Sequence, residues 1–135
     1  MLNKYQAICS ETGITFTISV KTANLSFIEP ADLITLLSNI LDNAVEAAKD
    51  SKERTIEFSV NRRNGFDVLT CANSCDSPPL SEGKRLFTTK KSAGFHGLGV
   101  KSIEKTATKY RGEFDWVYDG TEKQFIVNIA FFHQI

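Results

Sequence analysis

Residues 32–50 read DLITLLSNILDNAVEAAKD. Apolar residues recur through this stretch three and four positions apart, at Leu33, Leu36, Leu37, Ile40, Ala44, Ala47 and Ala48. That spacing places them along one side of an α-helix, where they can be buried against a core. Pro30, just upstream, suits the first turn of a helix. The stretch therefore predicts an amphipathic helix, and this is the strongest structural signal in the chain.

The segments on either side of this helix alternate between apolar and polar residues, which is typical of strands with one buried face. Residues 14–20 alternate in this way before the helix, and residues 55–60 and 66–71 follow it. Asn64-Gly65 lies between the last two segments and is a strong signal for a tight turn, so an antiparallel hairpin is predicted.

A second helix is predicted to begin at Gly97-Leu98-Gly99 and to run to about Tyr110. Two strands follow, with a turn near Asp119-Gly120, and the last strand alternates at Phe125, Val127, Ile129 and Phe131. Strands that carry two helices on one face predict a two-layer sandwich of α+β type.

The composition excludes several classes of protein. A length of 135 residues suits one domain, and 41% hydrophobic residues with 24% charged residues are typical of a soluble globular chain. The 16 basic and 16 acidic residues leave no basic excess, which argues against nucleic acid as a partner. No apolar run is long enough for a membrane span or for the core of a signal peptide. The three cysteines form no disulfide framework, and the CxxxC spacing of Cys71 and Cys75 lacks a second ligand pair for zinc.

Three polar residues of the first helix are candidates for a site. Asn39, Asn43 and Glu46 are four and three positions apart, so they share one stripe beside the apolar face. Asparagine is a poor choice for the interior of a helix, which favours a functional reason for both. The alternative is that these side chains cap loops or face solvent.

A glycine-rich segment, Phe95-His96-Gly97-Leu98-Gly99-Val100, is predicted to turn into the second helix. Glycines let the backbone approach a bulky anion, and the free amides of a helix N-terminus point at it. Lys90, in Thr88-Thr89-Lys90-Lys91, could neutralise a phosphate tail nearby. The alternatives are an ordinary loop-to-helix turn and a solvated basic patch. The segment is not the dinucleotide fingerprint, and the chain has no Walker lysine motif.

Asn73 is predicted to follow the second strand of the hairpin, where the chain leaves the sheet. Its amide offers one donor and one acceptor, which complement the amino group and ring nitrogen of an adenine edge. The alternative is a turn-forming asparagine. The segment from Ala72 to Phe95 is long for a connection in so small a domain, which indicates either a functional loop or a disordered one.

Taken together, these features resemble the GHKL superfamily of ATP-binding domains, over about residues 13–131. Asn39-Ile40-Leu41-Asp42-Asn43-Ala44 resembles its N box, and Gly97-Leu98-Gly99 resembles its G2 box. Together with Thr88-Thr89-Lys90, the sequences of these boxes look most like those of the sensor histidine kinases of peptide quorum sensing and of citrate and malate sensing. The resemblance implies a Bergerat fold with a mixed, mainly antiparallel sheet. It also implies a single domain over residues 1–135, with a mobile ATP lid at about 76–95 that becomes ordered with nucleotide.

The resemblance also implies ATP and Mg²⁺ as cofactors and a role for each site residue. Asn43 would ligate Mg²⁺ through its amide oxygen, and Asn39 would support the metal or the phosphates. Glu46 would lie near the phosphates, and Asn73 would contact adenine. The phosphate tail would be held by Lys90, His96, Gly97, Leu98 and Gly99. Phe87 would pack under the lid.

Two departures from the family pattern concern nucleotide binding. The G1 box normally carries an Asp that receives the adenine amino group, and here Ala72-Asn73-Ser74 fills that region. Phe95 stands in place of the first G2 glycine. The phosphoacceptor is also absent, because neither His96 nor His133 is placed for that role.

We therefore expect the cytoplasmic catalytic domain of a membrane-anchored sensor kinase, without direct membrane contact. It would serve an upstream dimerisation and phosphoacceptor domain and, indirectly, a response regulator. Three alternatives remain. A serine kinase of the anti-sigma-factor type would normally have the G1 Asp. A degenerate domain would act only in protein contacts. A gyrase-like or chaperone-like ATPase would need an acid at position 39 to activate water.

Overall fold

The computed structural model describes residues 1–21, 23–78 and 93–132, with only the backbone path over residues 93–100. Its elements follow one another along the chain as α1 (Leu2–Thr12), β1 (Thr15–Val20), α2 (Pro30–Lys49), β2 (Thr55–Arg63), β3 (Phe66–Ser74), α3 (Ala93–Lys109), β4 (Glu113–Asp119) and β5 (Gln124–Phe132).

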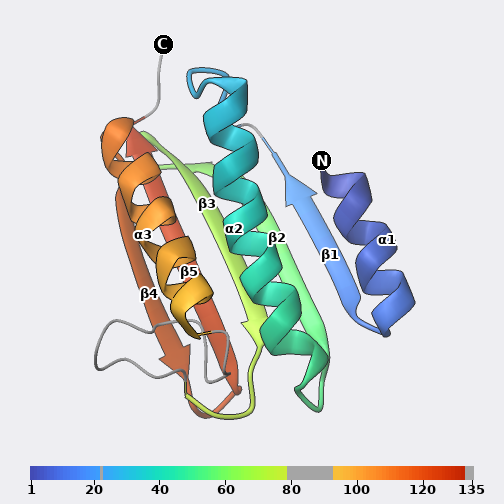
Figure 1. Ribbon diagram of the computed structural model, residues 1–135. Coiled ribbons are helices and arrows are strands. Elements are labelled where there is room, and N and C mark those ends of the chain that lie inside the picture. The colour runs from blue at the N-terminus through green and yellow to red at the C-terminus, as the bar shows by residue number, and fades with distance from the viewer. Residues whose placement is uncertain (22, 79–92, 133–135) are drawn as a thin grey trace.

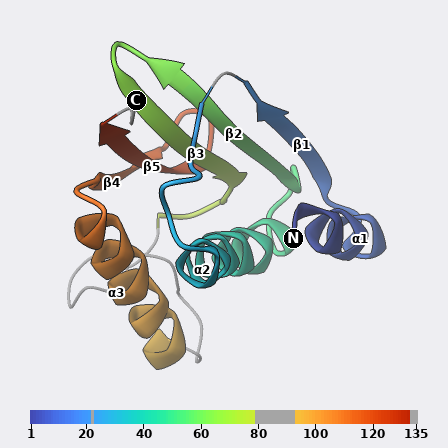
Figure 2. The same cartoon turned by 90° about the horizontal axis from the view of Figure 1, so that it is seen from above.

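Within the described residues, the sheet has five strands in the order β1-β2-β3-β5-β4. β1 pairs with β2 in parallel, and every other pair is antiparallel. A parallel pair needs a crossover connection, and α2 provides it between β1 and β2. The helices α1, α2 and α3 lie on one face of the sheet, as the view from above shows (Figure 1, Figure 2). The predicted α+β two-layer sandwich with a mixed, mainly antiparallel sheet is therefore confirmed.

The predicted central helix is confirmed as α2. Pro30 occupies its first turn together with Asp32, and Lys49 lies in its last turn, so the charges at both ends complement the helix dipole. Its apolar stripe is buried against the sheet at Leu36, Leu37, Ile40, Leu41, Ala44 and Ala48. In the described part of the chain, no helix has both the length and the hydropathy that a bilayer crossing requires.

The predicted hairpin is also confirmed, with longer strands than the pattern indicates. Asn64 and Gly65 have φ angles of 51° and 82°, the two positive values that a type I′ turn requires. β3 continues to Ser74, three residues beyond the predicted end, because β2 pairs with it on one side and β5 on the other. The four alternating aromatic and aliphatic residues of β5 are all buried, as predicted: Phe125, Val127, Ile129 and Phe131.

The first helix, α1, was not predicted from the sequence. It ends at Gly13, whose φ of 74° is left-handed and whose N–H reaches the carbonyls of Cys9 and Ser10. Tyr5 is buried, and its hydroxyl donates to Asp42 Oδ1 of α2 at 2.6 Å. Burial, reinforced by this hydrogen bond, raises the pKa of Tyr5 to about 12, so the phenol stays protonated and remains a donor. α1 is thereby attached to the helix that carries the candidate site residues.

A cluster of polar contacts joins the start of α2 to the end of α3. Lys109 Nζ donates to Asp32 Oδ2 at 2.8 Å, and the Tyr110 hydroxyl donates to the same oxygen. The Tyr110 oxygen also accepts the backbone N–H of Glu29 at 3.1 Å. These contacts fix one end of the helix pair, since both helices are held at the same carboxylate.

This cluster gives a prediction for acid stability. The hydrogen bonds from Lys109 and Tyr110 hold the pKa of Asp32 below its ordinary value. A lowered folded-state pKa means that the stabilisation is complete above the unfolded value of about 3.9 and is lost as the pH falls through the lower folded value. Asp32→Asn is therefore expected to be less stable than the parent at pH 7, and the difference should shrink towards pH ~2. Urea unfolding at both pH values measures this. A difference that stays constant across the range would contradict the assignment.

Candidate functional site

The polar stripe of α2 lies on the side of the helix that faces α3. Asp32 touches α3 through Lys109, and Asn39, Asn43 and Glu46 follow it at helical spacing along the same stripe. α2 also packs on β3, so the stripe runs beside both neighbours. The structure therefore brings the three predicted residues together on one surface, as the sequence indicates.

Asn43 is the most enclosed member of the stripe, with 5% of its surface exposed. Its side-chain Nδ2 donates to the backbone carbonyl of Asn39 at 2.9 Å. This bond fixes the orientation of the amide and leaves Oδ1 as the available atom, and among the described residues nothing donates to it. An amide oxygen is a hard ligand of the kind Mg²⁺ accepts, so the donor chemistry at this position suits the metal that the family resemblance implies.

The other two residues of the stripe are half-buried. Glu46 Oε1 lies 3.5 Å from Lys49 Nζ, one turn further along the helix. This contact between partly exposed groups contributes little to stability, on the order of 0.3–0.5 kcal/mol. Asn39 contributes its carbonyl to Asn43, which gives it a positioning role in addition to whatever its side chain binds.

Asn73 lies inside β3, so the prediction that it follows the strand is wrong. It pairs with Ile56 on one side and with Phe125 on the other, and pairing on both sides outweighs the weak strand preference of asparagine. It is 3% exposed, and its Nδ2 donates to the Ser74 carbonyl at 3.0 Å. This bond uses one of the two N–H groups of the amide and leaves Oδ1 as the acceptor that would receive an amino group.

Two buried serines, which sequence reasoning missed, connect the end of α2 to the end of β3. The hydroxyl oxygens of Ser51 and Ser74 are 2.6 Å apart. Because Ser51 donates to the Ala48 carbonyl at 2.7 Å, Ser74 is the donor between the two. The Thr55 N–H also donates to Ser74 Oγ, at 2.9 Å. This network holds Asn73 at a fixed position relative to α2. The sequence signal for this network was Ser51, which directly follows the helix predicted over residues 32–50.

The glycine-rich segment is helical, because α3 begins at Ala93. The prediction of a turn that leads into a helix at Gly97 is therefore wrong by four residues. In an α-helix the N–H groups of the first four residues have no partner within the helix, and here these are residues 93–96. The N–H groups of Gly97, Leu98 and Gly99 come later and have partners within the helix. His96 carries one of the free amides, and Phe95 another.

Some predicted residues lie outside the described part of the chain. Phe87, Lys90 and His133 belong to this group, as does most of the predicted lid. The thiols of Cys9 and Cys71 are buried, and burial raises the pKa of Cys71 to about 12, which makes it an unreactive thiol at neutral pH.

Comparisons with known proteins agree on the family. A model of the GHKL domain matches residues 28–132. The sensor histidine kinase NatK of Bacillus subtilis (strain 168) is 30% identical over 118 residues, which cover 84% of this chain and 37% of NatK. The chain thus spans less than half the length of this curated relative.

Solved structures share the fold at low sequence identity. The histidine kinase AdeS of Acinetobacter baumannii matches with a TM-score of 0.70 at 12% identity, over 99% of this chain and 61% of that one. The catalytic domain of the histidine kinase ThkA, in a nucleotide-free form, matches with a TM-score of 0.69 at 17% identity, over 96% of this chain and 86% of that one. The chain belongs to the GHKL domain family and has the fold of a histidine kinase catalytic domain.

Proposed function

We propose that this chain binds Mg-ATP between α2, the end of β3 and the start of α3, and supplies the γ-phosphate to a histidine on a dimerisation domain of the same kinase. The observation that carries the proposal is the oriented amide of Asn43, whose nitrogen is held by the Asn39 carbonyl at 2.9 Å. An amide oxygen that is already oriented needs no rearrangement to become a ligand.

The roles divide along the site. Asn73 Oδ1 accepts the adenine amino group, in place of the family's aspartate. Asn43 Oδ1 ligates Mg²⁺, which when bound neutralises charge on the phosphates. Asn39 supports this position, and Glu46 lies near the phosphates. Lys90 and the free N–H groups at the start of α3, that of His96 among them, hold the phosphate tail beside residues 97–99, with Phe87 packed under a lid at about 76–95.

The residue types favour phosphoryl transfer over hydrolysis. Transfer requires positioning and charge neutralisation more than covalent help from the protein. Hydrolysis needs a group that accepts a proton from water, and the amide of Asn39 cannot accept one. The same argument disfavours a gyrase-like ATPase.

The parent protein is proposed to be a membrane-anchored sensor kinase in which residues 1–135 form one cytoplasmic domain. NatK is a sensor histidine kinase of which this chain matches 37%, which leaves room for the other parts of such a protein. A response regulator would then receive the phosphate. Labelled phosphate that appears on a histidine when this chain is joined to its dimerisation domain would support this assignment.

Calorimetric titration of the purified chain tests nucleotide binding. We expect one ATP per chain in the presence of Mg²⁺, with binding weakened when the metal is chelated. No heat with ATP, ADP or a non-hydrolysable analogue at millimolar concentration would instead favour a degenerate domain that acts only in protein contacts.

A further inference from the structure

Two buried hydroxyls join the elements that carry the proposed nucleotide contacts. Ser51 lies just after α2 and is 6% exposed, and Ser74 is the last residue of β3 and is 2% exposed. Their Oγ atoms are 2.6 Å apart. We call these two residues the serine pair. Since α2 carries Asn43 and β3 carries Asn73, the pair links the element of the proposed metal ligand to that of the proposed base contact.

The hydroxyls of the serine pair are fully hydrogen-bonded. Ser51 donates to the Ala48 carbonyl at 2.7 Å and accepts the backbone N–H of Arg54 at 3.1 Å. Ser74 accepts the backbone N–H of Thr55 at 2.9 Å and donates to Ser51, which is closer than its other acceptor, the Thr55 carbonyl, at 3.3 Å. A buried polar network in which every group is paired is rigid and favours one arrangement of the elements that it joins.

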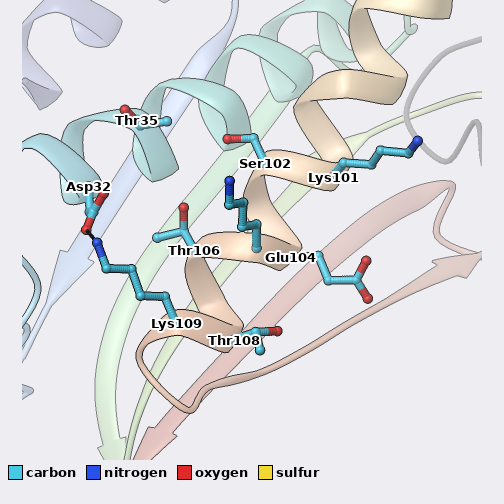
Figure 3. Close-up of a pocket in the computed structure, with 9 residues that line it drawn as sticks. Asp32, Thr35, Lys101, Ser102, Glu104, Thr106, Thr108 and Lys109 are labelled. Atoms are coloured by element: carbon cyan, nitrogen blue, oxygen red, sulfur yellow. Dashed lines mark hydrogen bonds and ion pairs between the residues drawn. The ribbon is translucent and has the colours of Figure 1, made fainter.

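The helix α2 is held at both of its ends. At its start, Lys109 Nζ of α3 donates to Asp32 Oδ2 at 2.8 Å (Figure 3). At its end, the serine pair attaches it to β3. The spacing between Asn43 and Asn73 is therefore set before a nucleotide arrives, and a preorganised site binds its ligand at a lower entropic cost.

The main chain of Ser74 orients the side chain of Asn73. Asn73 Nδ2 donates to the Ser74 carbonyl at 3.0 Å, and no donor among the described residues reaches Asn73 Oδ1. Turning the amide over would exchange the places of its nitrogen and its oxygen. The Ser74 carbonyl opposes this, because a carbonyl accepts a hydrogen bond from Nδ2 and repels Oδ1. The direction of Oδ1 therefore depends on where the Ser74 carbonyl lies.

We propose that Ser51 and Ser74 are positioning residues for base recognition, which hold the Ser74 carbonyl where it keeps Asn73 Oδ1 directed at the base. The inference rests on the proposed function, because it concerns the same nucleotide site. An acceptor at this position receives the 6-amino group of adenine and repels a 6-oxo group. The serine pair thus sets the preference of the site for 6-aminopurines.

The test compares ATP with purine riboside triphosphate, which lacks the 6-amino group, by calorimetric titration of the whole chain with Mg²⁺. The parent is expected to bind ATP about fivefold more tightly, the usual effect of one hydrogen bond. Ser74→Ala removes the bonds to Ser51 and to the Thr55 N–H, so this preference should fall to about twofold or less. A serine pair that only stabilised the fold would lower both affinities equally and leave their ratio unchanged.

Two further variants isolate the serine pair. Ser51→Ala is the milder change, because it leaves Ser74 bonded to Thr55, and we expect a preference between those of the parent and of Ser74→Ala. Thr70→Val is the matched control. The Thr70 hydroxyl also belongs to β3, but it donates to Asn128 Oδ1 at 2.8 Å, so its loss should leave the preference at the parent value. Thermal unfolding checks the fold of each variant.

The outcomes separate this inference from the proposed function. An unchanged preference in Ser74→Ala and Ser51→Ala, or an equal loss in Thr70→Val, would overturn the positioning role while nucleotide binding stands. Equal affinity of the parent for the two nucleotides would show that Asn73 Oδ1 does not receive the amino group. No binding of either nucleotide by the parent would overturn the proposed function and this inference with it.

Discussion

Replacing Asn43 by alanine is expected to abolish magnesium-dependent ATP binding while the fold stays intact. Metal affinity falls 10–100-fold when only a supporting group is lost, so removal of the ligand itself should cost at least about 100-fold. The fold should persist, because the side chain's hydrogen bond is to the Asn39 carbonyl of its own helix and alanine is the better helix former. Calorimetric titration with and without Mg²⁺ measures the loss, and thermal unfolding checks the fold.

Two control variants make this result specific. Asn43→Asp keeps an oxygen ligand and should retain binding that depends on Mg²⁺. Asn24→Ala removes an exposed asparagine outside the helix and should bind ATP as the parent does. Full metal-dependent binding by Asn43→Ala would show that the metal is held elsewhere.

Gly112→Ala is expected to destabilise the protein by about 1–3 kcal/mol, the usual cost of an added group in a packed core. A Cβ at Gly112 would lie 2.6 Å from Phe131 Cε1 and 3.2 Å from the Ala107 carbonyl oxygen. Phe131 is fully buried and packs edge-on against Phe27 at 5.5 Å, so its ring has little room to move. Urea unfolding measures the change.

Gly120→Ala is the matched control, because its Cβ would meet nothing closer than 3.9 Å. Its stability should stay within about 0.5 kcal/mol of the parent. If the collision is the cause, adding Gly112→Ala to a Phe131→Leu background should cost less than it does in the parent, since the ring is then absent. Equal costs in both backgrounds would contradict this explanation.

The elements with long regular patterns could be predicted from the sequence alone. α2 has an apolar stripe over its whole length, and β5 carries a large apolar residue at every second position from Phe125 to Phe131. The turn at Asn64-Gly65 was equally clear, since few residue pairs accept two positive φ angles. These elements determine the fold, and they place Asn39 and Asn43 on one stripe.

The remaining features depend on tertiary contacts that no local pattern contains. α1 is short, and its burial of Tyr5 becomes evident only when Asp42 is seen beside it. Asn73 is held in a strand by two neighbouring strands, against its own preference. The Ser51–Ser74 contact joins residues that are 23 positions apart. The early start of α3, at Ala93, was hidden by glycines that ordinarily signal a helix boundary.

The most direct test of nucleotide binding at this site is a crystal structure of the chain with Mg²⁺ and a non-hydrolysable ATP analogue. The account predicts the metal on Asn43 Oδ1 and the adenine amino group within hydrogen-bond distance of Asn73 Oδ1. A nucleotide that contacts neither residue, or no nucleotide at millimolar concentration, would contradict it.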